Sequence, residues 1–163
     1  MRAKSVHTLG PSKQLAWPLN SALCVITMKL ERIDYKDLNP KGQEVYNFHK
    51  AAAILADYGY NCIWLTNDWN GADFIAVHHD GMSDIKVQLK GGISFDKKYQ
   101  NKNLYIAFIE NGDLYLYPHD KILDQVQSVI SDKKWLEKGS YFQTKITKRF
   151  RDILEPYKVQ KHT

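Results

Sequence analysis

Three polar residues near the middle of this 163-residue chain have types and an order suited to a metal-assisted site. Asp73 directly follows Gly71-Ala72, and Gln88 and Lys90 come a short distance further along the chain. A carboxylate and an amide oxygen are suitable ligands for a hard divalent cation, and an ammonium offsets negative charge on a bound anion. These groups can act together only if the fold brings them to one place.

The segment from Asp84 to Lys90 is predicted to be a strand, because its apolar and polar residues alternate. Side chains on a strand point to opposite faces in turn. The apolar face carries Ile85, Val87 and Leu89, and the polar face carries Asp84, Lys86, Gln88 and Lys90. A helix is expected to cover the apolar face, so the polar row should face a cleft or solvent.

A tight hairpin is predicted to lead into this strand. The segment Ala72 to His78 is rich in Phe, Ile and Val, and Asp80-Gly81 is a strong turn signal. In an antiparallel hairpin, the start of the first strand lies beside the end of the second. Asp73 should therefore lie near Gln88 and Lys90, which places one carboxylate, one amide and one ammonium at a strand end.

The remaining segments predict a mixed α/β fold in one domain. Apolar residues spaced three and four apart predict a helix from Gly42 to Tyr58, which Gly59 ends. The apolar positions of this helix are Val45, Phe48, Ala52, Ile54, Leu55 and Tyr58. Further strands are predicted at Asn61 to Thr66 (ended by a turn at Asn67 to Gly71), Asn103 to Glu110 and Asp113 to Tyr117, and C-terminal helices at His119 to Ile130 and Lys145 to Leu154. The order is a helix, a three-stranded meander, two further strands and C-terminal helices.

Composition indicates a soluble globular protein, with 44% apolar residues, 25% charged residues and a net charge of +5. That charge is compatible with an anionic partner, although many basic proteins bind no nucleic acid. The two unclustered cysteines, Cys24 and Cys62, favour a reducing, cytoplasmic setting and are too few for a four-ligand zinc site. No segment approaches the roughly 20 apolar residues that a membrane span needs, so no membrane partner is expected.

Residues 28–163 are expected to form the single domain, and residues 1–27 a poorly structured N-terminal extension. The run from Leu15 to Met28 is moderately apolar and follows two lysines, which is also a feature of secretory signals. Pro18 and polar residues interrupt the run, and no small-residue cleavage site follows it cleanly. An extension is therefore favoured over a signal peptide.

A Gly-x-Asp turn followed by a hairpin to a strand that ends in Gln-x-Lys resembles the PD-(D/E)XK nuclease superfamily in its glutamine variant. By that resemblance, over roughly residues 40 to 117, Asp73 takes the place of the first acidic residue, Gln88 of the second and Lys90 of the lysine. Glu44 corresponds to a glutamate that many members carry on the preceding helix. Gly-Ala stands before Asp73 in place of the proline, Gln88 lacks the usual negative charge, and the segment 91–103 is too short for a long crossover helix.

The resemblance implies a restriction-endonuclease-like core and hydrolysis of a phosphodiester by metal-activated water. Mg²⁺ is the expected cofactor, with Mn²⁺ as an alternative, and Asp73, Gln88, Glu44 and the carbonyl of Leu89 are the implied ligands. Lys90 would orient the water or offset the developing charge. DNA is the expected partner, for cleavage of a restriction, homing or repair type, with RNA still open as a substrate. A homo-oligomer is expected because cutting both strands calls for two sites.

Other polar residues are candidates for contacts with nucleic acid. Phosphate-neutralising residues interleaved with aromatic ones suit such a surface. The candidates are Lys97 and Lys98 (with Ser94 nearby) after the site strand, and Lys145, Lys148, Arg149 and Arg151 near the C-terminus. The plainer interpretation of the first group is a charged loop, and the aromatic residues among the second are more simply packing residues of the final helix. Gln88 and Lys90 could likewise be the solvated face of a strand. The sequence His78-His79-Asp80 is interpreted as a solvated turn, because neighbouring strand residues point to opposite faces.

Two further functions compete with the nuclease hypothesis. A catalytically inactive nucleic-acid-binding module of the same fold is credible because Gln88 replaces an acid. A structural or regulatory subunit whose basic surface meets an acidic protein is the third hypothesis. Metal-dependent cleavage that is lost on replacing Asp73 or Lys90 separates the first function from the other two.

Overall fold

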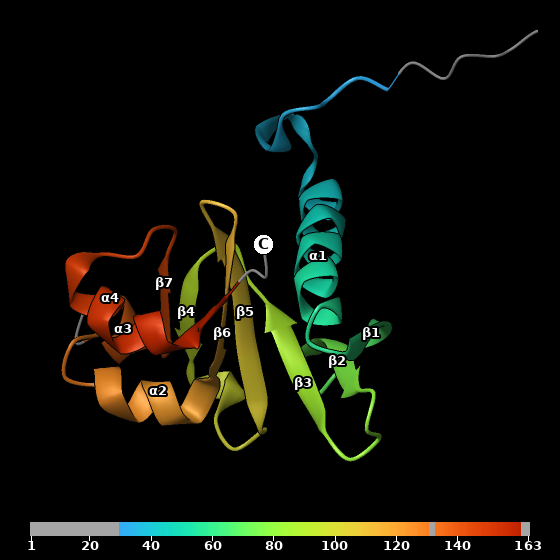
Figure 1. Ribbon diagram of the computed structural model, residues 1–163. Helices are drawn as coiled ribbons and strands as arrows, with labels where there is room; N and C mark the ends of the chain where they lie inside the picture. Colours follow the sequence, from blue (N-terminus) through green and yellow to red (C-terminus); the bar gives the residue numbers. More distant parts are fainter. Residues whose placement is uncertain (1–29, 131–132, 161–163) are drawn as a thin grey trace, which may run out of the picture. The chain divides into compact units, whose positions relative to one another are not determined.

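The computed structural model describes residues 30–130 and 133–160 (Figure 1). The expected extension, residues 1–27, lies outside the described residues. The chain divides into two compact units, residues 1–32 and 33–163, and all the features below belong to the second. Within the described ranges, no helix is long and apolar enough to cross a membrane.

A six-stranded mixed sheet forms the centre of the second unit. Its strands, in spatial order, are β1 (Tyr60–Trp69), β2 (Ala72–His78), β3 (Asp84–Leu89), β5 (Leu104–Glu110), β6 (Asp113–Pro118) and β8 (Lys158–Val159). All neighbours are antiparallel except β3 and β5, which run parallel. The predicted mixed α/β class is confirmed, as is the three-stranded meander of β1, β2 and β3.

The connection from β3 to β5 contains a strand that sequence reasoning missed. After β3 the chain forms β4 (Ile93–Asp96) and a short 3-10 helix, η2 (Lys97–Tyr99). β4 pairs with β7 (Ser140–Gln143) in a separate two-stranded sheet. The interpretation of this segment as a charged loop is therefore wrong for Ser94, which lies in a buried strand with Ile93 and Phe95, whereas Lys97 and Lys98 are exposed.

The helix α1 (Pro40–Ala56) covers the apolar face of the β2–β3 hairpin, as predicted. It begins two residues earlier than expected, because the side chain of Asn39 accepts the N–H of Gly42 at 2.7 Å and proline suits the first helical position. Ala51 and Leu55 are buried against a cluster that includes Phe74, Val87 and Leu89. Val45 belongs to the exposed side instead, with 38% of its surface accessible.

The β1–β2 hairpin is longer than expected. β1 continues past Thr66 to Trp69, so the predicted turn shrinks to Asn70 and Gly71. Both residues have positive φ, 59° and 94°, as a tight two-residue hairpin turn requires. The pairing register with β2 shifts between Trp64 and Trp69.

A second hydrophobic core lies between the sheet and the C-terminal helices. These helices are α2 (His119–Val126), α3 (Lys133–Lys138), α4 (Lys148–Leu154) and the 3-10 turn η3 (Glu155–Tyr157). α2 stops at Val126, short of the predicted Ile130. α4 begins at Lys148, later than predicted, because the residue that caps it, Thr147, has an extended backbone.

Candidate active site

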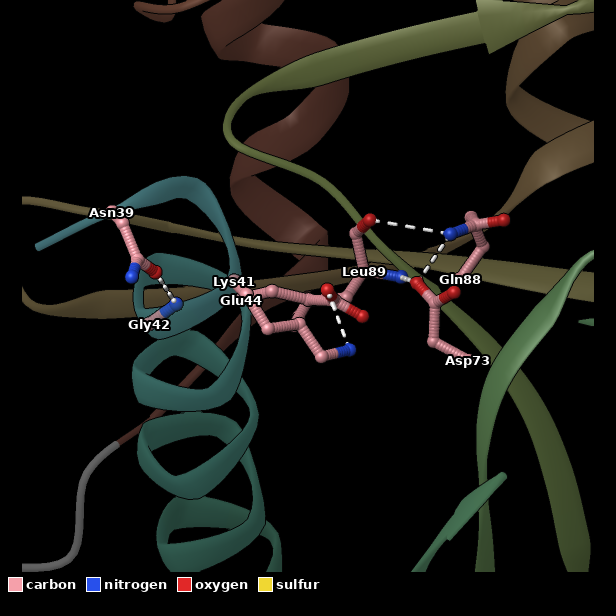
Figure 2. A network of polar contacts seen from close by, with 7 residues as sticks. All are labelled: Asn39, Lys41, Gly42, Glu44, Asp73, Gln88 and Leu89. Atoms are coloured by element: carbon pink, nitrogen blue, oxygen red, sulfur yellow. Dashed lines mark hydrogen bonds and ion pairs between the residues drawn. The ribbon is translucent and has the colours of Figure 1, made fainter. Parts of the chain in front are cut away.

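Asp73 ties the two strands of the hairpin together at the end where the site was expected (Figure 2). Its Oδ2 accepts the backbone N–H of Leu89 at 2.7 Å and also a hydrogen bond from Nε2 of Gln88. Phe74 pairs with Val87 in the antiparallel hairpin, so the preceding residue of β2, Asp73, lies opposite the following residue of β3, Gln88. The antiparallel hairpin therefore brings the carboxylate and the amide together, as the sequence predicts.

Gln88 is held in a buried position, with 8% of its surface exposed. Its strand partner on the other side is Ile106 of β5. Besides contacting Asp73, Nε2 donates to the carbonyl oxygen of Leu89 at 3.3 Å. Two oxygens from different strands thus converge on one amide nitrogen.

Lys90 follows directly after β3 and continues its pairing with β5, because its N–H donates to Ala107 at 2.8 Å. Its ammonium nitrogen lies 5.2 Å from the centre of the Tyr99 ring, an attractive arrangement between a cation and an aromatic face. Burial lowers the pKa of Lys90, whereas the negative charges of Asp73 and Asp96 oppose that shift. The lysine is therefore partly desolvated and directed toward the carboxylates.

Glu44 reaches the same place from the first turns of α1. It lines a cleft of about 330 Å³ together with Asp73 and Gln88. Its Oε2 accepts a hydrogen bond from Nζ of Lys41 at 2.9 Å, and Lys41 lines the cleft as well. Lys90 does not line this cleft but lines a neighbouring hollow with Glu44 and Leu89, so all four residues proposed as catalytic lie near the start of α1 and the end of the hairpin.

The charge of Asp73 is set by opposing influences. Burial raises the pKa of Asp73, whereas the N–H of Leu89 and the positive charge of Lys90 lower it, and the charge of Glu44 raises it. A carboxylate whose pKa is raised by a second one nearby is suited to share a cation with it.

The oxygens of this region fit a hard divalent cation. Asp73 and Glu44 offer carboxylates, Leu89 a carbonyl, and Gln88 an amide oxygen if its amide is turned round. Within residues 30–130 and 133–160, no three His, Cys, Asp or Glu side chains form a ligand cluster. Such a cation would therefore depend on the neutral oxygens as well as on the two acids.

One lysine and two aromatic rings that the sequence did not single out, Lys41, Trp64 and Tyr99, also line the cleft. Tyr99 lines it, with Nζ of Lys98 4.9 Å from its ring centre, and Lys41 lies 5.0 Å from the ring centre of Trp64. Lys98 was expected near phosphate and does line this cleft. The spacing of Lys41 and Glu44, one helical turn apart, was a signal that could have identified Lys41.

The other predicted nucleic-acid contacts lie elsewhere. Lys97 lies 5.3 Å from the ring centre of Trp135, Arg149 donates to the hydroxyl of Tyr141 at 2.8 Å, and Arg151 donates to the carbonyl of Ile146 at 3.3 Å. Lys145 and Lys148 are exposed. Of the described residues, those lining the cleft include Lys41 and Lys98 but none of these C-terminal side chains.

The remaining polar candidates have structural partners. Ser94 is buried, and both its N–H and its carbonyl bond to the hydroxyl of Tyr117, so little of this residue is accessible to a phosphate. His78 contacts Asp80 at 2.8 Å within the predicted turn. His119 is fully buried, where Nε2 accepts the N–H of Asp96 at 3.2 Å.

Comparisons with protein-family models, curated proteins and solved structures found no significant match to this chain. Functional inference therefore rests on the residues and geometry described above.

Proposed function

We propose that this chain is a Mg²⁺-dependent DNA endonuclease of the restriction-endonuclease-like class. The observation that carries the proposal is that Asp73, Gln88 and Glu44 line one cleft, while the ammonium of Lys90 lies close enough to Asp73 for their charges to interact. A helix followed by three antiparallel strands, with the next strand of the sheet parallel to the third, supports the same assignment. Lysines beside the carboxylates suit a phosphodiester substrate.

Each residue has a distinct task in this proposal. Asp73, Glu44 and the carbonyl of Leu89 would hold the cation, which would increase the acidity of a bound water and offset charge on the phosphate. Lys90 stabilises the negative charge that develops on the phosphate, because its ammonium is partly desolvated and held over the ring of Tyr99. Lys98 attracts the DNA backbone at the edge of the cleft.

Cleavage of supercoiled plasmid with Mg²⁺ or Mn²⁺ tests the proposal. We expect nicking or linearisation by the parent protein and at least a hundredfold loss in Lys90→Met, as for other electrostatic catalytic groups. Lys86→Met is the matched control, because Lys86 is a half-buried lysine of β3 whose ammonium bonds to the carbonyl of Lys102 at 3.0 Å, away from the proposed site. Equal activity in Lys90→Met would place any cleavage outside this site.

A nucleic-acid-binding module without activity is the second candidate. The orientation of Gln88 favours it, because the amide nitrogen and not the oxygen faces Asp73. DNA binding that falls steeply with salt, with no cleavage of plasmid or branched DNA in either metal, would support this alternative.

A further inference from the structure

The amide of Gln88 faces the wrong way for a metal ligand. Nε2 donates to Oδ2 of Asp73 and to the carbonyl oxygen of Leu89, two oxygens that a cation would use (Figure 2). The reverse orientation would press Oε1 against two other oxygens, so these acceptors determine which way the amide points. A cation that recruits Oε1 must therefore compete with both hydrogen bonds.

Hydrogen bonding and Mg²⁺ coordination hold neighbouring atoms at similar separations. Mg²⁺ holds oxygens at about 2.0–2.1 Å in an octahedron, which places adjacent ligands about 2.9 Å apart. Hydrogen-bonded nitrogen and oxygen atoms have nearly the same separation, about 2.9–3.0 Å. A half-turn of the Gln88 amide about its terminal torsion therefore puts Oε1, a possible metal ligand, where Nε2 now donates. The rest of the side chain keeps its buried position. The terminal torsion of glutamine is broad and roughly two-fold, so the rotation itself is easy.

We propose that Gln88 is a two-state positioning residue that sets the affinity of the site for a divalent cation. In the first state its NH₂ group donates hydrogen bonds to Asp73 and to the carbonyl of Leu89. In the second state its oxygen is a ligand of the cation, together with the oxygens of Asp73 and Leu89. This inference rests on the metal site of the proposed function. Breaking the two amide hydrogen bonds weakens cation binding, whereas a glutamate at position 88 has no such competing state and adds a negative charge.

Side-chain amide signals in nitrogen–proton NMR spectra of the full chain report this rotation directly. The two Gln88 signals are assigned by their loss in Gln88→Glu. On titration with MgCl₂, and separately with CaCl₂, we expect their chemical shifts to move toward those of an amide that no longer donates to Asp73 and Leu89. Gln43 is the internal control, because its Nε2 also donates to two carbonyls, those of Leu38 at 3.1 Å and Tyr35 at 3.3 Å. Its signals should stay in place.

Calorimetric titration with MgCl₂ measures how strongly the two amide hydrogen bonds of Gln88 compete with cation binding, and it needs no nucleic-acid substrate. We expect Gln88→Glu to tighten the Mg²⁺ dissociation constant by about tenfold or more, because affinity follows the charge of the ligand set. Asp73→Asn should abolish the binding. An unchanged dissociation constant in Gln88→Glu would overturn the inference.

The remaining outcomes separate this inference from the proposed function. Asp73-dependent binding that leaves the Gln88 signals in place would overturn the two-state role and leave the nuclease proposal standing. Binding in Gln88→Glu alone would mean that the native amide never turns toward a cation, so it would overturn the two-state role and would also contradict metal-dependent cleavage by the native chain. No binding in either protein would overturn the inference.

Discussion

The hydroxyl of Tyr117 donates to the carbonyl of Ser94 at 2.9 Å and accepts the N–H of the same residue at 3.1 Å. This pair of bonds joins β6 of the main sheet to β4 of the small sheet, across the fully buried ring of Tyr117. The connection between β3 and β5, which follows the site residues in the chain, is therefore held to the main sheet through Tyr117.

Tyr117→Phe should destabilise the protein by about 1–3 kcal/mol, because the buried N–H and carbonyl of Ser94 lose the hydroxyl. The aromatic ring is kept, so hydrophobic packing changes little. Chemical denaturation monitored by circular dichroism measures the change in the free energy of unfolding. A loss well below 1 kcal/mol would mean that the hydroxyl does not hold β4 in place.

Two neighbouring glycines should respond differently to a methyl group. A Cβ at Gly92 would lie 2.3 Å from the backbone oxygen of Gln143, whereas one at Gly91 would meet only the ring of Phe142 at 3.9 Å. Gly92→Ala should therefore force β4 away from β7 and cost roughly 1–3 kcal/mol or more, by overpacking. Gly91→Ala is the matched control and should change thermal stability little. Similar melting temperatures for the two variants would contradict the close approach of β4 and β7.

Lys90→Met should retain or raise the melting temperature while it removes cleavage. Burial already disfavours the charged ammonium, as the lowered pKa of Lys90 shows, and methionine fills a similar volume without a charge. Differential scanning calorimetry beside the plasmid assay measures both effects. A marked fall in melting temperature would mean that the lysine stabilises the fold, and the loss of activity would then say little about catalysis.

The core of the site could be predicted because local rules determine it. Alternation along Asp84 to Lys90 assigns Gln88 and Lys90 to one face, and the short Asp80-Gly81 turn fixes which residues of β2 lie opposite. The position of Asp73 follows from those two facts alone. Glu44 needed the resemblance as well, because a helix can enter a sheet at several angles.

What the sequence could not show depends on contacts between distant segments. β4 is only four residues long and pairs with β7, far along the chain, so no local pattern marks either strand. Tyr99 reaches the cleft because η2 turns the chain there, and its order in the sequence does not indicate this. The direction of the Gln88 amide depends on which atoms surround it, and that information appears only in three dimensions.

Cys62 should be an unreactive thiol at neutral pH. It lies in β1 opposite Ala76, against the core beneath α1, and burial raises the pKa of its thiol from an ordinary 9.0 to about 11. Because the folded state holds this proton more tightly, the group's contribution to stability is complete below pH 9.0 and is lost as pH rises through about 11. In a Cys24→Ser background, the rate of alkylation of Cys62 by iodoacetamide should keep rising with pH between 9.0 and about 11. In the urea-unfolded chain, which is the control, the alkylation rate should stop rising a little above pH 9.0. A folded chain that behaves in the same way would contradict the burial of this thiol.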